Sequence, residues 1–281
     1  MSTRATDSGP LVVSATSLAG SAEPVIPQEN IYGHRQRLDW LRGWLRPERR
    51  AVEFGCGTGY MLTRPLRLWG YDVIGVDLDA ASIALGRELL EQVGLDPSAV
   101  SVRRLEELDP GVDAVIASEV LEHLDDQELE VCLDVIRDKL AADGRLLVTV
   151  PNGYGWFELE GPLWFRTGIG RFFEWPPVQR FVQRAHGVLT RGYVDAAYPS
   201  TVAHSPHRQR FTMRSIRGLL ERHGFDVIEA RGSVLVCGPF SNLAFTGLRR
   251  VMTLNRRLGR RLPRLAAGFY LAAKKSAAVE S

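Results

Sequence analysis

Cysteine is scarce in this chain of 281 residues, and its three cysteines, Cys56, Cys132 and Cys237, form no CxxC pair. An odd, unpaired set of this kind argues against disulfide bridges and for reduced thiols. Long apolar runs are also missing, because none approaches the ~18–20 residues of a membrane span. The apolar patch at 11–19 is interrupted by Ser and Thr, unlike the core of a signal peptide. We therefore expect a cytoplasmic protein.

Acidic residues are absent from 231–279, a stretch that holds eight Arg and two Lys. Because the net charge of the whole chain is only +2, the remainder is acidic on balance. This asymmetry predicts an anionic substrate or surface facing the C-terminal part. The acidic remainder and the lack of a recognisable RNA-binding module argue against a nucleic-acid partner.

An amphipathic helix is expected in 243–264, with arginines on one face and apolar side chains on the other. Such a helix can lie on an anionic membrane or bind phosphate groups. The alternative is a solvated basic helix that docks by its apolar side. The apolar positions are Leu248, Val251, Met252, Leu258 and Leu262, and the arginines are Arg249, Arg250, Arg256, Arg257, Arg260 and Arg261.

Strand and helix patterns alternate along most of the chain, which is 45% apolar. Strands are expected at 51–54, 71–76, 100–105, 112–117, 145–150, 225–229 and 268–273. Helices are expected at 32–45, at 79–92 after the cap Asp79, from the capping box Asp125–Glu128 to Gly144, and from the cap Thr212 to Gly224. This alternation predicts an α/β fold, a doubly wound and mostly parallel seven-stranded sheet with helices on both faces.

Four regions are predicted. Residues 1–30 form a flexible tail, 31–150 a cofactor-binding core, 151–210 a substrate lid, and 211–281 the rest of the core with a basic insertion at 232–265. Nine of the 24 aromatic residues lie between Tyr154 and Phe181. Those rings either stack on a sugar or aromatic acceptor, bury a lipid, or form the lid's own small core.

A glycine-rich turn follows the first strand, in the run Glu53-Phe-Gly55-Cys-Gly57-Thr-Gly59. Glycines at such a turn let the backbone approach a ligand closely. A dinucleotide site normally has GxGxxG and places phosphate at the helix N-terminus, where the acid Glu53 would be unfavourable. Glu53 suits the amino group of a methionine moiety instead. Asp77, which ends the second strand about 20 residues on, suits ribose hydroxyls, or is simply a surface acid.

These residues, with Asp113–His123 and Leu140–Pro151, resemble the motifs of the seven-strand, Rossmann-like methyltransferases that use S-adenosylmethionine. The resemblance implies that Gly55, Gly57 and Gly59 line the methionine and ribose, that Glu53 lies near the amino group, and that Asp77 holds the ribose. It also implies that Leu78 packs on the adenine and that Ser118 lies at the cofactor. Many relatives have an acid after the third strand, but Arg104-Leu105 stands there in this chain, so the backbone of Leu105, or Glu106, is expected to substitute.

A metal site is a further expectation. Glu119, Glu122 and His123 have the spacing of one side of a helical turn, at the sheet edge where ligands bind. Alternatively, Glu119 contacts backbone while the other two cap the next helix. Together with His207, or His204 as substitute, they resemble the metal-using quinone-biosynthesis O-methyltransferases and small-RNA 2′-O-methyltransferases. That resemblance implies the ligands Glu119, Glu122, His123 and His207 for Mg²⁺ or Mn²⁺, with Zn²⁺ less favoured.

The expected function is metal-assisted O-methylation of a sugar, glycan or other vicinal-diol metabolite, with phosphorylated and lipid-linked acceptors included. Glu122, His123 and His207 are the expected catalytic residues, with a histidine taking the acceptor proton. The alternatives are metal-free O- or N-methylation with a histidine base, ribose methylation of RNA, a cofactor-binding protein without catalysis, and, least favoured, an oxidoreductase.

Overall fold

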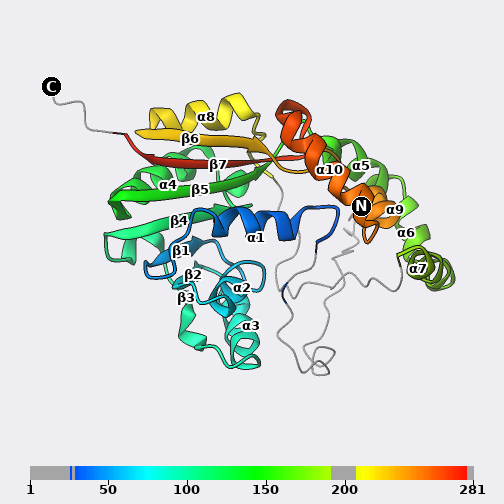
Figure 1. Cartoon of the computed structure of the whole chain (residues 1–281), viewed down its shortest axis with the longest axis horizontal. Helices are drawn as coiled ribbons and strands as arrows, with labels where there is room; N and C mark the ends of the chain where they lie inside the picture. Colours follow the sequence, from blue (N-terminus) through cyan, green and yellow to red (C-terminus); the bar gives the residue numbers. More distant parts are fainter. Residues whose placement is uncertain (1–25, 27–28, 191–206, 277–281) are drawn as a thin grey trace, which may run out of the picture.

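The computed structural model describes residues 26, 29–190 and 207–276, and within them seven strands form one sheet (Figure 1). The strand order is β3-β2-β1-β4-β5-β7-β6. All neighbouring strands are parallel except the pairs that β7 makes with β5 and β6. The strands are β1 Ala51–Phe54, β2 Val73–Asp77, β3 Val100–Val102, β4 Val112–Ser118, β5 Leu140–Pro151, β6 Phe225–Gly232 and β7 Gly268–Lys275.

Helices lie on both faces of the sheet and at one end of it. The helices are α1 His34–Arg42, α2 Thr63–Leu68, α3 Ala80–Glu91, α4 Asp126–Lys139, α5 Trp156–Arg166, α6 Ile169–Glu174, α7 Pro176–Thr190, α8 Met213–Arg222, α9 Pro239–Phe245 and α10 Arg249–Arg261. Short 3₁₀ turns are η2 Pro97–Ala99, η3 Leu105–Glu107, η4 Leu121–His123 and η5 Pro263–Leu265. The doubly wound, mostly parallel fold predicted from the alternating pattern is confirmed.

Two apolar cores result from the alternation of side chains along the strands. Ala114 and Ile116 of β4 face α1 and α2, whereas Val115 and Ala117 face α4 and α8. Successive strand residues point to opposite faces, so a strand covered on both sides must be apolar along its covered length, as β4 is from Ala114 to Ala117. The helices contribute the apolar stripe that their spacing predicted.

The helix caps form as the sequence predicts. The Asp79 carboxylate accepts from the backbone N–H of Ser82, and Asp125 with Glu128 forms a reciprocal capping box. Thr212 likewise begins α8, sharing a capping box with Ser215. Each cap satisfies N–H groups that the first helical turn leaves unpaired.

Several predicted boundaries are wrong, and the clearest cases are the ends of α4 and β3. Helix α4 ends at Lys139 rather than at Gly144, because Leu140 turns to extended backbone and pairs with Val112. The Lys139 carbonyl accepts from Gly111 instead of continuing the helix. Strand β3 stops at Val102 rather than at Leu105, and Leu105 begins the turn η3. Tertiary pairing with a neighbouring segment decides both ends.

Helices α5 and α6, which fall in the segment predicted as a substrate lid, pack on α9 (Figure 1). Trp164 of α5 stacks on Phe173 and contacts Phe240 of α9 edge-on, with ring centroids 5.5 and 5.0 Å apart. The buried Glu160 carboxylate accepts from the backbone N–H of Ser241 at 2.9 Å. Trp164 and Phe173 thus share a small core with Phe240, but Phe165, Phe172 and Phe181 are exposed. No described helix is both long and apolar enough to cross a bilayer.

Candidate functional site

The glycine bend connects β1 to α2 at the carboxyl edge of the sheet. Gly55, Gly57 and Gly59 all have left-handed backbone, with φ of 68°, 55° and 66°. A Cβ on Gly55 would lie 2.5 Å from a methyl of Val120, whereas one on Gly57 would meet no atom within 4 Å. Glycine is therefore required by conformation at all three positions and by close packing at Gly55. The open side of Gly57 leaves room for a ligand against the backbone.

Glu53 is buried, with 4% of its surface exposed, directly beneath this bend. Its Oε2 accepts from the backbone N–H of Thr63 at 2.8 Å and from the Thr63 hydroxyl at 2.5 Å. Burial raises the pKa of Glu53 to about 7, although both Thr63 hydrogen bonds and the charge of Arg37 lower it. A cation placed beside this carboxyl group would favour its charged form.

Replacing Glu53 with glutamine is expected to remove a pH-dependent loss of stability. Because the folded pKa is about 7 against 4.5 for the ordinary group, the folded state binds more protons between these values. Wild-type stability therefore falls as pH rises through this window. In urea unfolding at about pH 8, Glu53→Gln should exceed the wild type by up to about 3 kcal/mol, with near equality at about pH 4.

The control for this comparison is Glu91→Gln, which changes an exposed acid at the end of α3. Its difference from the wild type should be the same at both pH values. An equal difference for Glu53→Gln at both pH values would contradict the proposed burial effect.

Asp77 closes the bend from the second strand. Its Oδ2 accepts from the backbone N–H of Gly57 at 2.7 Å, and its Oδ1 accepts from that of Asp79 at 2.9 Å. The next side chain, Leu78, is 63% exposed beside it. A half-buried carboxylate next to an exposed apolar side chain offers acceptors for hydroxyls and a surface for a flat ring.

Leu105 and Ser118 occupy different surroundings. Leu105 is buried at the start of η3, so its side chain belongs to the core. Ser118 ends β4, and its hydroxyl lies 2.8 Å from that of Thr149 on β5. Strands β1, β2 and β4 thus bring Glu53, Asp77 and Ser118 to one edge of the sheet.

Arg37 is a site residue that the sequence motifs missed. One guanidinium nitrogen donates to the Ser118 hydroxyl at 3.3 Å, and another lies 3.3 Å from Oε1 of Glu119. Burial lowers the pKa of Arg37, but the charges of Glu119 and Tyr270 outweigh burial and raise it overall. The sequence does contain one indication of this role. Arg37 lies one turn before Leu41, which places a basic residue on the apolar face of the predicted helix.

Glu122, His123 and His207 converge on one another. Their ligand atoms all lie within 4.8 Å, and the two imidazole rings are 5.2 Å apart. Backbone N–H groups of Arg208 and Gln209 donate to the Glu122 carbonyl at 2.8 and 3.0 Å, which brings the downstream segment to η4. The predicted pairing of distant residues is present in the structure.

Glu122 is the buried member of this group, with 1% of its surface exposed. Burial, and secondarily the charge of Glu119, raise the pKa of Glu122 to about 9. Its Oε2 is buried and has no hydrogen-bond partner among the described residues. A buried carboxylate oxygen without a partner is costly, and a cation would satisfy it.

Glu119 lies outside this group, contrary to the expected set of four. Its backbone is left-handed, with φ of 55°, so the segment does not form the helical turn that the spacing implied. Its Oε1 instead accepts from the Thr149 hydroxyl at 2.9 Å and pairs with Arg37. The expected substitute His204 lies outside the described residues.

Comparison with known proteins adds three kinds of similarity. A family model described as "Methyltransferase domain" matches residues 29–230. The indolepyruvate C-methyltransferase of Streptomyces griseus is 29% identical over 164 residues, which are 55% of this chain and 47% of that protein. The ubiquinone biosynthesis O-methyltransferase of Sinorhizobium fredii is 32% identical over 92 residues, which are 31% of this chain and 37% of that protein. Each alignment therefore covers less than half of the relative.

Solved structures agree on the fold. A methyltransferase in the complex with the Trm112 activator from Haloferax volcanii superposes with a TM-score of 0.53 at 14% identity, covering 90% of this chain and 92% of that one. A SAM-dependent methyltransferase from Methanosarcina mazei superposes with a TM-score of 0.51 at 16% identity, covering 84% and 97%. At these identities the similarity extends to the architecture alone.

Proposed function

Because the chain belongs to the methyltransferase-domain family, we propose that it transfers the methyl group of S-adenosylmethionine to a hydroxyl of a sugar, glycan or other vicinal-diol metabolite. A divalent metal ion is proposed to assist. The observation that carries the proposal is the arrangement of the glycine bend, with Asp77 on one side and the Glu122–His123–His207 group at the same sheet edge. In folds of this kind ligands bind at the carboxyl ends of the strands.

The methyl donor is proposed to bind across the bend. Gly55, Gly57 and Gly59 would line its methionine and ribose, and the Asp77 carboxylate would accept from the ribose hydroxyls. Leu78 would pack on the adenine, with the backbone of Leu105 or Glu106 meeting its polar edge. Glu53 would hold the donor's ammonium group, and Ser118 would line the methyl-bearing end.

The residues present fit a metal ion. Glu122, His123 and His207 offer one carboxylate and two imidazoles within 4.8 Å, and Oε2 of Glu122, which makes no hydrogen bond to any described residue, has the chemistry of a ligand. Mixed oxygen and nitrogen ligands with open positions suit Mg²⁺ or Mn²⁺, with Zn²⁺ less favoured. A bound ion would lower the pKa of an acceptor hydroxyl and orient it.

Methyl transfer is an in-line displacement, so alignment supplies much of the rate. The acceptor oxygen attacks the methyl carbon as the carbon–sulfur bond breaks, and the sulfur keeps the bonding electrons. The acceptor proton passes to a ring nitrogen of His123 or His207, whichever imidazole does not coordinate the ion. Arg37 pairs with Glu119, and we propose that this pair holds the end of β4 in place for the reaction.

The acceptor is proposed to reach this edge beneath the lid. The exposed rings of α5 to α7 suit stacking on a sugar or contact with a lipid chain. A phosphorylated or lipid-linked acceptor also agrees with the basic α10, which is proposed to touch anionic membranes peripherally. The three free thiols support a cytoplasmic location.

The alternative is metal-free methylation of a phenol, amine or carboxylate, with His123 or His207 as base. The C-methyl, O-methyl and protein methyltransferases among the relatives make the acceptor class the open part of the proposal. RNA ribose methylation is the third candidate, which a gel shift at moderate salt tests.

Calorimetry with S-adenosylmethionine, followed by incubation with labelled donor and an extract of the source cells, tests the main proposal. We expect saturable donor binding and label in a compound whose methyl ether survives mild base. Absence of donor binding would reject the methyltransferase reading.

Removing metal ions with a chelator distinguishes metal-assisted methylation from metal-free methylation with a histidine base. We expect EDTA to lower turnover at least about tenfold, with recovery on adding Mg²⁺ or Mn²⁺. Electron paramagnetic resonance should detect Mn²⁺ bound to the intact chain, independently of activity. Unchanged turnover in EDTA together with no bound Mn²⁺ would leave the histidine-base alternative.

A further inference from the structure

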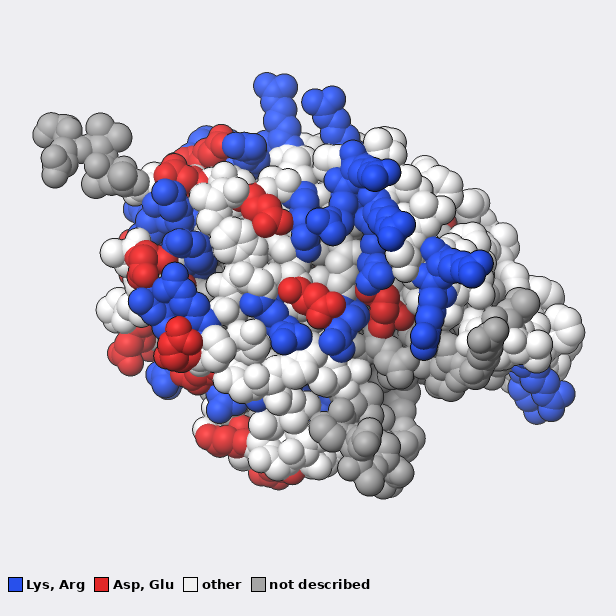
Figure 2. Space-filling view, viewed as in Figure 1, with Lys and Arg blue, Asp and Glu red and all other residues white. Residues whose placement is uncertain are grey.

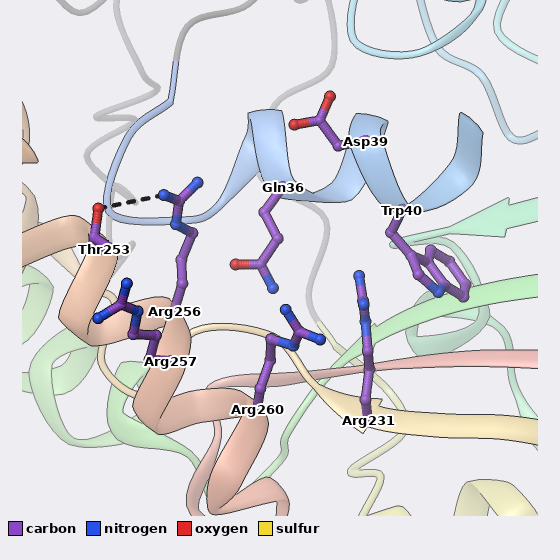
Figure 3. Close-up of a pocket in the computed structure, with 8 residues that line it drawn as sticks. All are labelled: Gln36, Asp39, Trp40, Arg231, Thr253, Arg256, Arg257 and Arg260. Carbon is purple, nitrogen blue, oxygen red and sulfur yellow. Dashed lines mark hydrogen bonds between the residues drawn. The ribbon is translucent and has the colours of Figure 1, made fainter. Parts of the chain in front are cut away.

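A cavity lies between α1, the end of β6 and α10, and none of its lining residues belongs to the glycine bend. Its volume is about 370 Å³, which is within the range of small-molecule sites. Figure 3 shows the side chains of α1 above it and those of α10 and β6 below. It is lined by Gln36, Asp39, Trp40, Arg231, Thr253, Arg256, Arg257 and Arg260.

Positive charge exceeds negative charge in this cavity. Arg256 is paired with Glu29 at 2.8 Å, but Arg257 and Arg260 have no acid within ion-pair distance among the described residues. The one lining acid, Asp39, pairs with Arg35 at 3.2 Å and turns its carboxylate away from the arginines (Figure 3). Two guanidinium groups are therefore left without a counter-charge.

Arg231 forms the floor of the cavity. Its guanidinium lies over the rings of Trp40 and Tyr270, 5.7 and 5.5 Å from their centroids. Its buried Nε makes no hydrogen bond to the described residues, although it forms an ion pair with an oxygen of Glu229 at 3.5 Å. Burial lowers the pKa of Arg231, Glu229 raises it, and the like charge of Arg260 lowers it. An anion in the cavity would relieve this repulsion.

Gln36 supplies a hydrogen-bond acceptor to the cavity, whereas the arginines supply donors. The residue is 9% exposed, and its amide nitrogen donates to the Ser233 carbonyl at 3.4 Å. Its buried Oε1 has no hydrogen-bond partner among the described residues. The cavity thus presents several cationic donors and one unsatisfied acceptor. A ligand with both anionic oxygens and a hydroxyl would satisfy both.

The cavity also lies at the ligand-binding edge of the sheet. Register pairs Ser118 with Thr149, Thr149 with Tyr270, and Tyr270 with Arg231. Because β6 runs parallel to β4 and β5, Arg231 stands at the carboxyl end of its strand, in the same row as Ser118. Figure 2 shows basic side chains gathered over α10 on this face, and all the basic residues of α10 are arginines.

We propose that this cavity is a binding site for a phosphate monoester bearing a free hydroxyl, separate from the methyl-donor site. Arg257 and Arg260 meet the phosphate oxygens, Arg231 holds them from below, and the Gln36 carbonyl accepts from the hydroxyl. Planar guanidinium groups are suited to phosphate through paired hydrogen bonds. The site does not depend on methyl transfer.

Calorimetry with glucose 6-phosphate as the probe tests the site on the intact chain. Arg257→Gln/Arg260→Gln should weaken binding at least about tenfold. The matched double variant Arg261→Gln/Arg264→Gln removes the same charge outside the cavity and should stay within about twofold of the wild type. Equal weakening by both variants, or no binding by the wild type, overturns the proposal.

Two further arms identify the source of the phosphate. Inorganic phosphate tests the anion alone, and phosphatidylcholine vesicles with and without phosphatidic acid test a lipid headgroup. If Arg257→Gln/Arg260→Gln, but not Arg261→Gln/Arg264→Gln, loses binding of inorganic phosphate or of the phosphatidic acid vesicles, the site is supported. The probe that the wild type binds then tells whether the phosphate comes from a free anion or from a lipid headgroup. Vesicle binding lost equally in both double variants, without a glucose 6-phosphate response, would indicate a diffuse basic surface and reject the cavity. S-adenosylmethionine binding is measured on the same variants. A failure of the proposed methyltransferase activity can then be told apart from a failure of the phosphate site.

Discussion

Replacing Glu122 with glutamine is expected to lower the rate of methyl transfer by about a hundredfold or more while donor affinity changes by less than about threefold. The reason is the position of its carboxylate, which is buried beside His123 and His207 and has one oxygen that no described residue hydrogen-bonds. Glutamine keeps the size but loses the charge that would bind a cation. Single-turnover transfer of labelled methyl and donor calorimetry measure the two quantities.

The test of Glu122→Gln needs two further variants, one at an exposed acid as a control and one at another residue of the Glu122–His123–His207 group. Asp138→Asn, on the exposed side of α4, should leave both quantities unchanged. His207→Gln should lose transfer to a similar degree and should also lose bound Mn²⁺. If Glu122→Gln retains full transfer while His207→Gln does not, the metal reading is wrong and the histidine base stands.

Replacing Asp77 with alanine is expected to weaken S-adenosylmethionine binding by about a hundredfold. Its carboxylate accepts from the backbone N–H groups of Gly57 and Asp79, so the change loosens the bend. It also removes the acceptor proposed for the ribose. Calorimetry on the folded variant measures the effect, and thermal unfolding without donor measures the loss from the bend alone.

Asp72→Asn is the control, because Asp72 lies just before β2, at the opposite end from Asp77, and pairs with Arg50 and Arg67 on the surface. It should leave donor affinity unchanged. An Asp77→Ala chain that binds the donor as tightly as the wild type would exclude Asp77 from the cofactor site.

The elements that the sequence predicted well are those governed by local chemistry. The caps Asp79, Asp125 and Thr212 satisfy N–H groups within three residues of themselves, so their identity is enough to start a helix. The bend at Gly55 to Gly59 has the left-handed conformation that only glycine adopts freely. The convergence of Glu122 and His207 was predictable only through resemblance, since 84 intervening residues carry no local signal of contact.

The residues that the sequence misplaced depend on distant partners. Glu119 has the spacing of a ligand, yet Arg37 and Thr149 hold it, and neither is near it in the chain. The end of α4 was misplaced for the same reason, because Val112 of β4 takes Leu140 into the sheet. Pairing between segments outweighs the helix-stopping preference of Gly144.

The sequence by itself determined the seven-stranded α/β architecture, the glycine bend and the acids that flank it, because strand periodicity, capping and left-handed glycine backbone are local properties. Only the tertiary structure decided that Arg37 reaches Ser118, that Glu119 leaves the histidine group, and that Arg231 meets the arginines of α10 across from Gln36. Those contacts join segments of α1, β4, β6 and α10 that strand order and helix packing bring together. Because the segments are far apart in the chain, the spacing of residues along the sequence does not predict the contacts.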